Sequence, residues 1–170
     1  FDWNCQIHNG QIVWQRGCGL DGLSKSIEIF LYNDKGISQL TDNNYIDNYP
    51  QIHNGQVVWL GWVRTYMQIF FYDGSHIGQL TNDDSWKGDP QIHNGQITWW
   101  GCFQANVALS EIFLYDGAKI LRLTNNNYPD LYPQINNGKV VWQGWDGNDY
   151  EIFLYDGTYT LQLTNNDYND

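Results

Sequence analysis

A ten-residue segment occurs four times along this 170-residue chain, and it limits the possible folds more than any other feature. The segment reads Pro-Gln-Ile-His-Asn-Gly-Gln-Val-Val-Trp at residues 50–59 and recurs with few changes at residues 5–14, 90–99 and 133–142. The tryptophans that end the copies are Trp14, Trp59, Trp99 and Trp142, and they are separated by 45, 40 and 43 residues. Self-similarity at such a spacing is typical of architectures in which each copy is one supersecondary unit. We expect the four tryptophans to lie in the core.

Each unit has the pattern of four short strands, predicted in the second copy at residues 50–53, 56–61, 68–72 and 77–81. Asn54-Gly55 and Asp73-Gly74 are turn sequences, and Asn-Gly between strands is a strong hairpin signal. The two middle strands are apolar on both faces, so each small sheet needs a neighbour on both sides. Radial stacking provides this cover. The sequence therefore predicts an all-β protein, a β-propeller of four four-stranded antiparallel blades in one domain, with blades at about 1–49, 50–89, 90–132 and 133–170.

The repeat resembles the TolB-like family of propeller repeats, in all four copies. The resemblance rests on an Asp three residues before a Pro, a short strand ending in a Gly turn, an apolar strand, an Ile-aromatic strand and a closing Leu-Thr. The copies carry Asn-Gly where the family usually has Pro-Asp-Gly, and TolB-like propellers usually have more than four blades. Two alternatives stay open: four blades close into a ring alone, or the chain is half of a larger ring shared by two chains. Asp2 and Asp170 occupy the same repeat position, which makes a closed ring the simplest interpretation.

The charge balance restricts the partners. The formal net charge is −11, with eight Lys and Arg residues in the whole chain. Such a surface repels phosphate backbones and anionic lipid, so we expect neither nucleic-acid binding nor membrane binding. No apolar run approaches the roughly 20 residues that cross a bilayer. Cations and neutral polar molecules are the more natural ligands.

The copies differ most in the loops between the second and third strands, at residues 15–27, 60–67, 100–110 and 143–150. Binding surfaces are commonly built on loops held by a repeated scaffold. This variable rim is rich in aromatic residues that suit sugar rings or a protein partner. Its candidate ligand-binding residues are Trp62, Tyr66, Trp86, Trp100, Phe103, Trp145 and Tyr150. Tyr45, Tyr128 and Tyr168 lie in the connections between blades, on the same rim. The alternative is that these aromatic side chains only cover the ends of the blades.

Two polar sets are expected to line a central channel. His8, His53, His93 and Asn136 share one repeat position and would form a ring, in which three imidazoles suit a transition metal. Asp47, Asp130 and Asp170 share another position and are candidate calcium ligands, and Lys87 interrupts that set. In the alternative interpretation, each His satisfies backbone groups and each Asp caps its own turn. No cofactor is expected to be required, and calcium is a candidate. Residues 146–149 resemble half a calcium loop without the downstream Glu, so we expect a plain turn there.

Three cysteines leave at least one thiol without a partner inside the chain. Cys18 and Cys102 fall in predicted loops of the first and third blades, where a disulfide is one alternative. Cys5 replaces a repeat proline, and we expect a buried thiol there.

No motif brings a nucleophile together with a base, so we expect a protein that is not an enzyme. Three functions remain open. The first is a non-catalytic secreted or cell-surface binding module for a glycan or protein ligand. The second is a self-assembling structural protein or homo-oligomer. The third is the propeller portion of a larger envelope enzyme. The TolB-like resemblance implies a bacterial origin and a location at the envelope or outside the cell.

Overall fold

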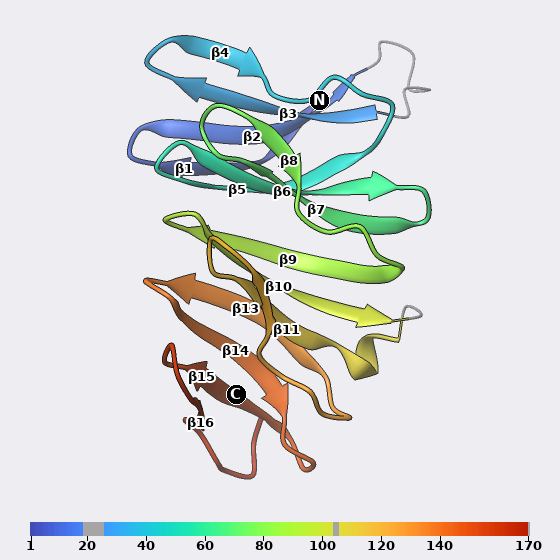
Figure 1. Ribbon diagram of the computed structural model, residues 1–170, viewed down its shortest axis with the longest axis vertical. Coiled ribbons are helices and arrows are strands. Elements are labelled where there is room, and N and C mark those ends of the chain that lie inside the picture. The colour runs from blue at the N-terminus through green and yellow to red at the C-terminus, as the bar shows by residue number, and fades with distance from the viewer. Residues whose placement is uncertain (19–25, 104–105, 170) are drawn as a thin grey trace. The chain divides into compact units, whose positions relative to one another are not determined.

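The computed structural model describes residues 1–18, 26–103 and 106–169, and of Cys18 only the backbone. It contains four antiparallel sheets of four strands each, and Figure 1 traces them from the N-terminus to the C-terminus. The chain therefore has the predicted all-β propeller architecture of four blades. The only helical element in the described ranges is the 3-10 helix η1 (Val107–Leu109). Within those ranges no helix has the length and apolar character needed to span a bilayer.

Each blade is a meander in which consecutive strands are hydrogen-bonded neighbours. The first blade contains β1 (Asp2–His8), β2 (Gln11–Cys18), β3 (Ser26–Asn33) and β4 (Gly36–Gln39). The second contains β5 (Asp47–His53), β6 (Gln56–Val63), β7 (Tyr66–Tyr72) and β8 (Ile77–Gln79). The third contains β9 (Ser85–His93), β10 (Gln96–Phe103), β11 (Glu111–Tyr115) and β12 (Ile120–Arg122). The fourth contains β13 (Asp130–Asn136), β14 (Lys139–Trp145), β15 (Tyr150–Tyr155) and β16 (Thr160–Gln162).

The hairpin turns follow the predicted chemistry. Asn54 has a φ of 49° and Gly55 a φ of 77°, which is the left-handed pair that a two-residue hairpin turn requires. The middle strands are longer than expected, however. In the second blade β6 and β7 pair as far as Val63 and Tyr66, so the predicted loop at residues 60–67 shrinks to a two-residue turn. Most residues of this predicted loop are therefore strand residues.

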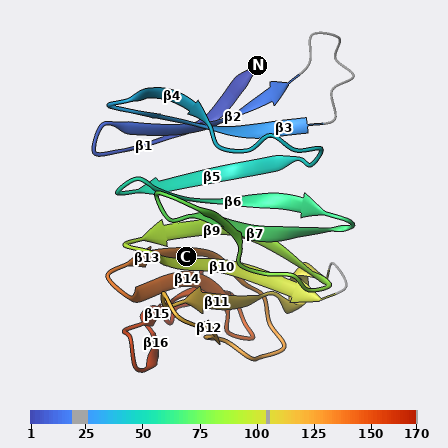
Figure 2. The ribbon, with the colours of Figure 1, turned by 45° about the horizontal axis from the view of Figure 1, so that its top comes forward.

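The chain forms two compact units, Phe1–Asp83 and Asp84–Asp170, each made of two blades. In the first unit Val13, Ile29 and Leu31 pack against Val57 and Trp59 of the second blade. This apolar layer fills the space between the two sheets, which lie face to face (Figure 2). Within this unit the adjacent blade covers one face of the middle strands.

The second unit repeats this packing. Ile112 and Leu114 of the third blade form one buried cluster with Val140 and Trp142 of the fourth. Trp59, Trp99 and Trp142 are buried as predicted, and each stacks on the phenylalanine of the neighbouring strand with ring centroids 5.8–5.9 Å apart. Trp14 makes the same stack on Phe30 but is only half-buried.

The first strand of every blade contains a bulge that the sequence pattern did not reveal. In β5 the register shifts between Asn48 and Gln51, and Tyr49 has a φ of 54°. A positive φ is rare for a bulky residue, so the surrounding contacts must stabilise it. The equivalent positions Asn4, Asp89 and Tyr132 also have positive φ. The extra residue of the bulge interrupts the regular alternation of side chains between the two faces of the strand.

One face of the fourth blade is open. Gln134, Val141, Leu154 and Leu161 are cross-strand neighbours on this open face. Val141 is 36% exposed and Leu161 48% exposed, whereas Val13, at the same repeat position as Val141 in the first blade, is fully buried. The residue types are those of a blade interface, but no blade covers them within this unit.

Candidate functional site

The predicted rim residues are distributed over several strands. Trp62 pairs with Met67 near the end of β6, Tyr66 begins β7 opposite Val63, and Trp86 lies in β9. Trp100 does not lie in a loop, because it pairs with Ile112 inside the third blade. Its indole donates a 2.8 Å hydrogen bond to Asp89 Oδ2, and it packs on Gly88, a contact that leaves no room for a larger residue. Phe103 is exposed at the end of β10.

The fourth blade brings two predicted rim residues together. Trp145 ends β14 and Tyr150 begins β15, and their rings meet edge to face at 81° with centroids 5.2 Å apart. The Trp145 amide donates a 3.0 Å hydrogen bond to the Pro129 carbonyl, which fixes the end of β14 against the connection from the third blade. Tyr128 in that connection is 43% exposed. Its hydroxyl lies close to the position that a side chain at Gly147 would take.

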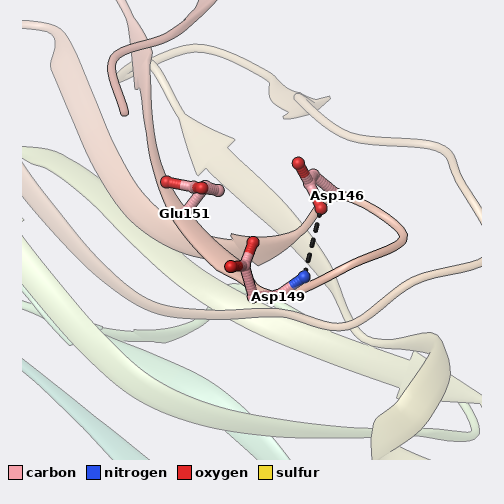
Figure 3. A group of neighbouring side chains, drawn as sticks. All are labelled: Asp146, Asp149 and Glu151. Atoms are coloured by element: carbon pink, nitrogen blue, oxygen red, sulfur yellow. Dashed lines mark hydrogen bonds between the residues drawn. The ribbon is translucent and has the colours of Figure 1, made fainter. Parts of the chain in front are cut away.

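Three carboxylates lie close together around the turn that follows Trp145, as Figure 3 shows. One oxygen each of Asp146, Asp149 and Glu151 lies within 4.8 Å of the others. Asp146 Oδ1 accepts hydrogen bonds from the amides of Asn148 at 2.8 Å and Asp149 at 3.3 Å, so Asp146 forms the predicted turn. These bonds lower the pKa of Asp146. We call Asp146, Asp149 and Glu151 the acidic cluster.

Asp149 and Glu151 differ from Asp146 because they are buried. Asp149 is 6% exposed and Glu151 is 0% exposed. Neither carboxylate oxygen of Asp149 has a hydrogen-bond partner, and Oε2 of Glu151 also has none. Burial raises the pKa of Asp149, and the nearby charges of Glu151 and Asp146 raise it further.

Sequence reasoning missed Glu151. It treated residues 146–149 as an isolated turn, but Asp149 and Glu151 are two positions apart at the start of a strand. Such residues point to the same side of a strand, and this alternation was the available signal.

The predicted calcium ligands Asp47 and Asp130 have other partners. Asp47 accepts a 3.0 Å hydrogen bond from the Trp59 indole and a 2.9 Å hydrogen bond from the side-chain amide of Asn43. Asp130 accepts the corresponding bonds from Trp142 and Asn126. The donors are side chains of the same blade and of the connection before it, so neither the predicted turn cap nor a calcium site is what these bonds show. Burial raises the pKa of both groups. Asp170 lies outside the described residues, so calcium at this set remains a prediction.

The histidines connect adjacent blades. In the first unit the rings of His8 and His53 have centroids 4.1 Å apart, and His8 Nδ1 accepts a 3.0 Å hydrogen bond from the Asn54 amide. In the second unit His93 Nδ1 accepts from the amide of Asn137, next to Asn136, at 3.1 Å. These bonds fit the backbone-satisfying role, and a complete ring with a metal remains a prediction.

The cysteine predictions have mixed outcomes. The prediction of a buried Cys5 is wrong, because Cys5 is exposed. It belongs to the first blade, and no earlier blade within its unit covers that side of β1. Cys102 is a buried free thiol inside β10, and burial raises its pKa. Cys102 is thus free in the structure, and the other end of the predicted bridge, the side chain of Cys18, lies outside the described residues.

Comparisons with solved structures support the fold. The β-propeller domain of the trilobed protease from Pyrococcus furiosus is similar over 95% of this chain and 54% of its own length, with a TM-score of 0.76 and 16% identity. An acylaminoacyl peptidase from Pyrococcus horikoshii matches 95% of this chain and 26% of its own, with a TM-score of 0.74 and 16% identity. TolB from Acinetobacter baumannii matches 91% of this chain and 40% of its own, with a TM-score of 0.60 and 15% identity.

No family model and no curated protein matches the chain. The chain spans about half of the trilobed protease domain and about a quarter of the peptidase. The fold is therefore that of a β-propeller similar to those of TolB and of these proteases.

Proposed function

We propose that this chain is a non-catalytic propeller module that binds a neutral glycan at the rim of its fourth blade. The observation that carries the proposal is the group of Tyr128, Trp145 and Tyr150 around the turn at residues 146–149. Aromatic rings offer flat apolar faces that suit the faces of sugar rings. The exposed side chains of Asp146 and Asn148 add hydrogen-bonding groups for hydroxyls beside those rings.

Charge favours a neutral sugar over an anionic ligand. The chain has a formal net charge of −11, and the rim of the fourth blade itself carries carboxylates. An anionic polymer would be repelled by this field, whereas a neutral oligosaccharide would not. The second and third strands of the blade, β14 and β15, provide a rigid support for Trp145 and Tyr150, which limits the entropy lost on binding.

Alanine substitution at Trp145 or Tyr128 should lower glycan affinity at least tenfold, because each removes a stacking surface near the centre of the site. Binding is measured by calorimetry with a panel of neutral hexasaccharides built from glucose, xylose or N-acetylglucosamine. Tyr45→Ala is the matched control, since Tyr45 occupies the same repeat position in the first unit as Tyr128 and is similarly exposed. Equal losses for Tyr45→Ala and Tyr128→Ala, or no binding by the panel, would contradict the proposal.

A second proposed role is that of a propeller portion of a larger protein, and the open face of the fourth blade supports it. Val141 and Leu154 have the same residue types as Val13 and Leu31, which are covered by Val57 and Trp59 of the second blade. The fourth blade therefore presents the surface on which a further blade packs. The solved propellers that this chain resembles are longer, and one of them is described as having an open velcro topology.

An extended chain tests this second role. When a copy of residues 48–83 follows Asp170, the new segment should fold as a fifth blade and cover the open face. Burial of two or three aliphatic side chains should raise the thermal midpoint by about 4 °C or more. An extension with the same composition in scrambled order is the control. If both extensions are digested equally by protease and leave the midpoint unchanged, the open face does not accept another blade.

Both roles are compatible with the proposed location at the bacterial envelope or outside the cell, and neither includes a catalytic step. Self-association of the chain would instead favour the alternative of a self-assembling structural protein. Light scattering at increasing protein concentrations measures this association directly.

A further inference from the structure

The acidic cluster concentrates negative charge at one end of the fourth blade, and this feature does not depend on glycan binding. Asp146 and Asp149 flank the turn between β14 and β15, and Glu151 follows on β15 (Figure 3). The three groups offer oxygen atoms that lie within 4.8 Å of one another. Oxygen ligands about 2.3–2.6 Å from one calcium ion would lie up to roughly 5 Å apart across it. The spacing therefore matches a shared cation.

Because two of its carboxylates are buried, the negative charge of the acidic cluster is unfavourable unless a positive charge compensates for it. Asp149 and Glu151 are more than nine-tenths buried, and three of their oxygens have no hydrogen-bond partner. A buried carboxylate without a partner loses its hydration and gains nothing in return. Among the described residues, no lysine or arginine forms an ion pair with Asp149 or Glu151. No cation from the described part of the chain compensates the charge of these two carboxylates.

The third blade shows how the same position is neutralised elsewhere. Glu111 occupies the repeat position of Glu151, and the Arg122 guanidinium binds its Oε1 at 2.9 Å. The fourth blade has Gln162 in place of Arg122, and it also has the additional carboxylate of Asp149. The charge that Arg122 provides in the third blade is therefore missing in the fourth.

The second blade lacks the cluster altogether. The chain from Gly61 to its partner Gln68 is as long as the chain from Gly144 to Glu151 in the fourth blade. In the second blade, however, Val63, Tyr66 and Gln68 occupy the positions of Asp146, Asp149 and Glu151. The fold does not need carboxylates at this turn. Their presence in the fourth blade calls for an explanation other than blade architecture.

We propose that Asp146, Asp149 and Glu151 bind a calcium ion. All three supply hard carboxylate oxygens, which calcium prefers, and the cluster contains no histidine or cysteine of the kind that selects zinc. Magnesium requires near-ideal octahedral geometry and keeps most of its water, so it fits a buried, irregular set less well. The ion neutralises the buried charge and joins the turn to β15. It thereby stiffens the segment between Trp145 and Tyr150.

Calorimetric titration of the chelator-treated chain with calcium chloride tests the proposal. We expect one site per chain with a Kd of about 0.1–1 mM, the range of extracellular calcium modules. Asp149→Asn and Glu151→Gln should each weaken binding at least tenfold. Asp34→Asn removes an exposed charge in the turn between β3 and β4, and it should leave the affinity unchanged.

A charge-supplying variant separates cation binding from a purely structural role. Gln162→Arg introduces the cation that Arg122 provides in the third blade, and Gln162 Nε2 already lies 3.5 Å from Asp146 Oδ2. This variant should raise the thermal midpoint of the calcium-free chain and lose calcium binding. Calcium should raise the midpoint of the unsubstituted chain and should not raise that of Asp149→Asn.

Three results would overturn the proposal: no saturable binding at millimolar calcium, undiminished binding by Asp149→Asn, or undiminished binding by Gln162→Arg. The second result would move the ion to a site outside the acidic cluster. Calcium binding without any glycan binding would leave this inference intact and would contradict the proposed glycan function alone.

Discussion

Replacing Trp59 with alanine should lower the free energy of unfolding by about 3–5 kcal/mol, the usual cost of removing a buried tryptophan. Trp59 is 1% exposed, stacks on Phe70 and donates its indole hydrogen to Asp47. The substitution opens a cavity between two blades and leaves an oxygen of the buried Asp47 without its partner. Both the cavity and the unpaired oxygen destabilise the folded state. Urea denaturation followed by far-ultraviolet circular dichroism measures the change.

Trp14→Ala is the matched control for that substitution. Trp14 stacks on Phe30 at 5.8 Å and donates to Asp2 at 2.8 Å, so its contacts repeat those of Trp59. It differs in being half-buried, and Asp2 is exposed. The cost should be at most about half of that for Trp59. Equal costs for the two substitutions would show that stacking and the indole hydrogen bond, rather than burial between blades, determine the stability.

Alanine at Gly61 should cost about 2–3 kcal/mol, because the added methyl group has no space. Its Cβ would lie 2.6 Å from Phe70 Cε2 and 2.8 Å from Asp47 Oδ1, so it would displace the buried carboxylate from the Trp59 indole. Gly61 has no positive φ, so the substitution tests the contact and not the backbone conformation. Alanine also reduces the entropy of the unfolded chain, which offsets the loss by less than about 1 kcal/mol.

Gly101 provides the comparison, since it occupies the same repeat position in the third blade. There the nearest atom to an added Cβ is Phe113 Cε2 at 3.1 Å, and Lys87 stands where Asp47 does. Gly101→Ala should therefore cost about 1 kcal/mol or less. Thermal unfolding of both variants measures the difference. A larger loss at Gly101 than at Gly61 would show that the aspartate contact is not what excludes a side chain.

Local patterns predicted the strands, the hairpin turns and the tryptophan register because these depend on neighbouring residues. The bulge was not predictable in this way: Tyr49 adopts a positive φ only because the assembled blade holds it. The loop at residues 60–67 was misplaced for a related reason. Trp62 and Tyr66 are compatible with either loop or strand, and their placement depends on pairing that continues to the end of the hairpin.

The candidate site was predictable only in part. Trp145 and Tyr150 were found because their residue types suit ligand binding, and the structure places their rings in contact. Glu151 was not found, because residues 146–149 were compared with a calcium loop that needs a Glu at another spacing. The same repeat position holds Glu28 in the first blade, where Thr41 and Asn43 satisfy its oxygens. A repeated residue has different roles in different copies, and only the three-dimensional surroundings distinguish them.

The open face of the fourth blade also affects how the molecule moves. Hydrogen-exchange opening depends on how much apolar surface a segment releases, so a strand covered on one side opens at lower free energy than one covered on both. We therefore expect the near-identical blades of this chain to differ in hydrogen-exchange protection. Fraying should begin at β16 and spread inward toward Trp142. Neighbours, rather than sequence, decide which copy of the repeat is the most dynamic.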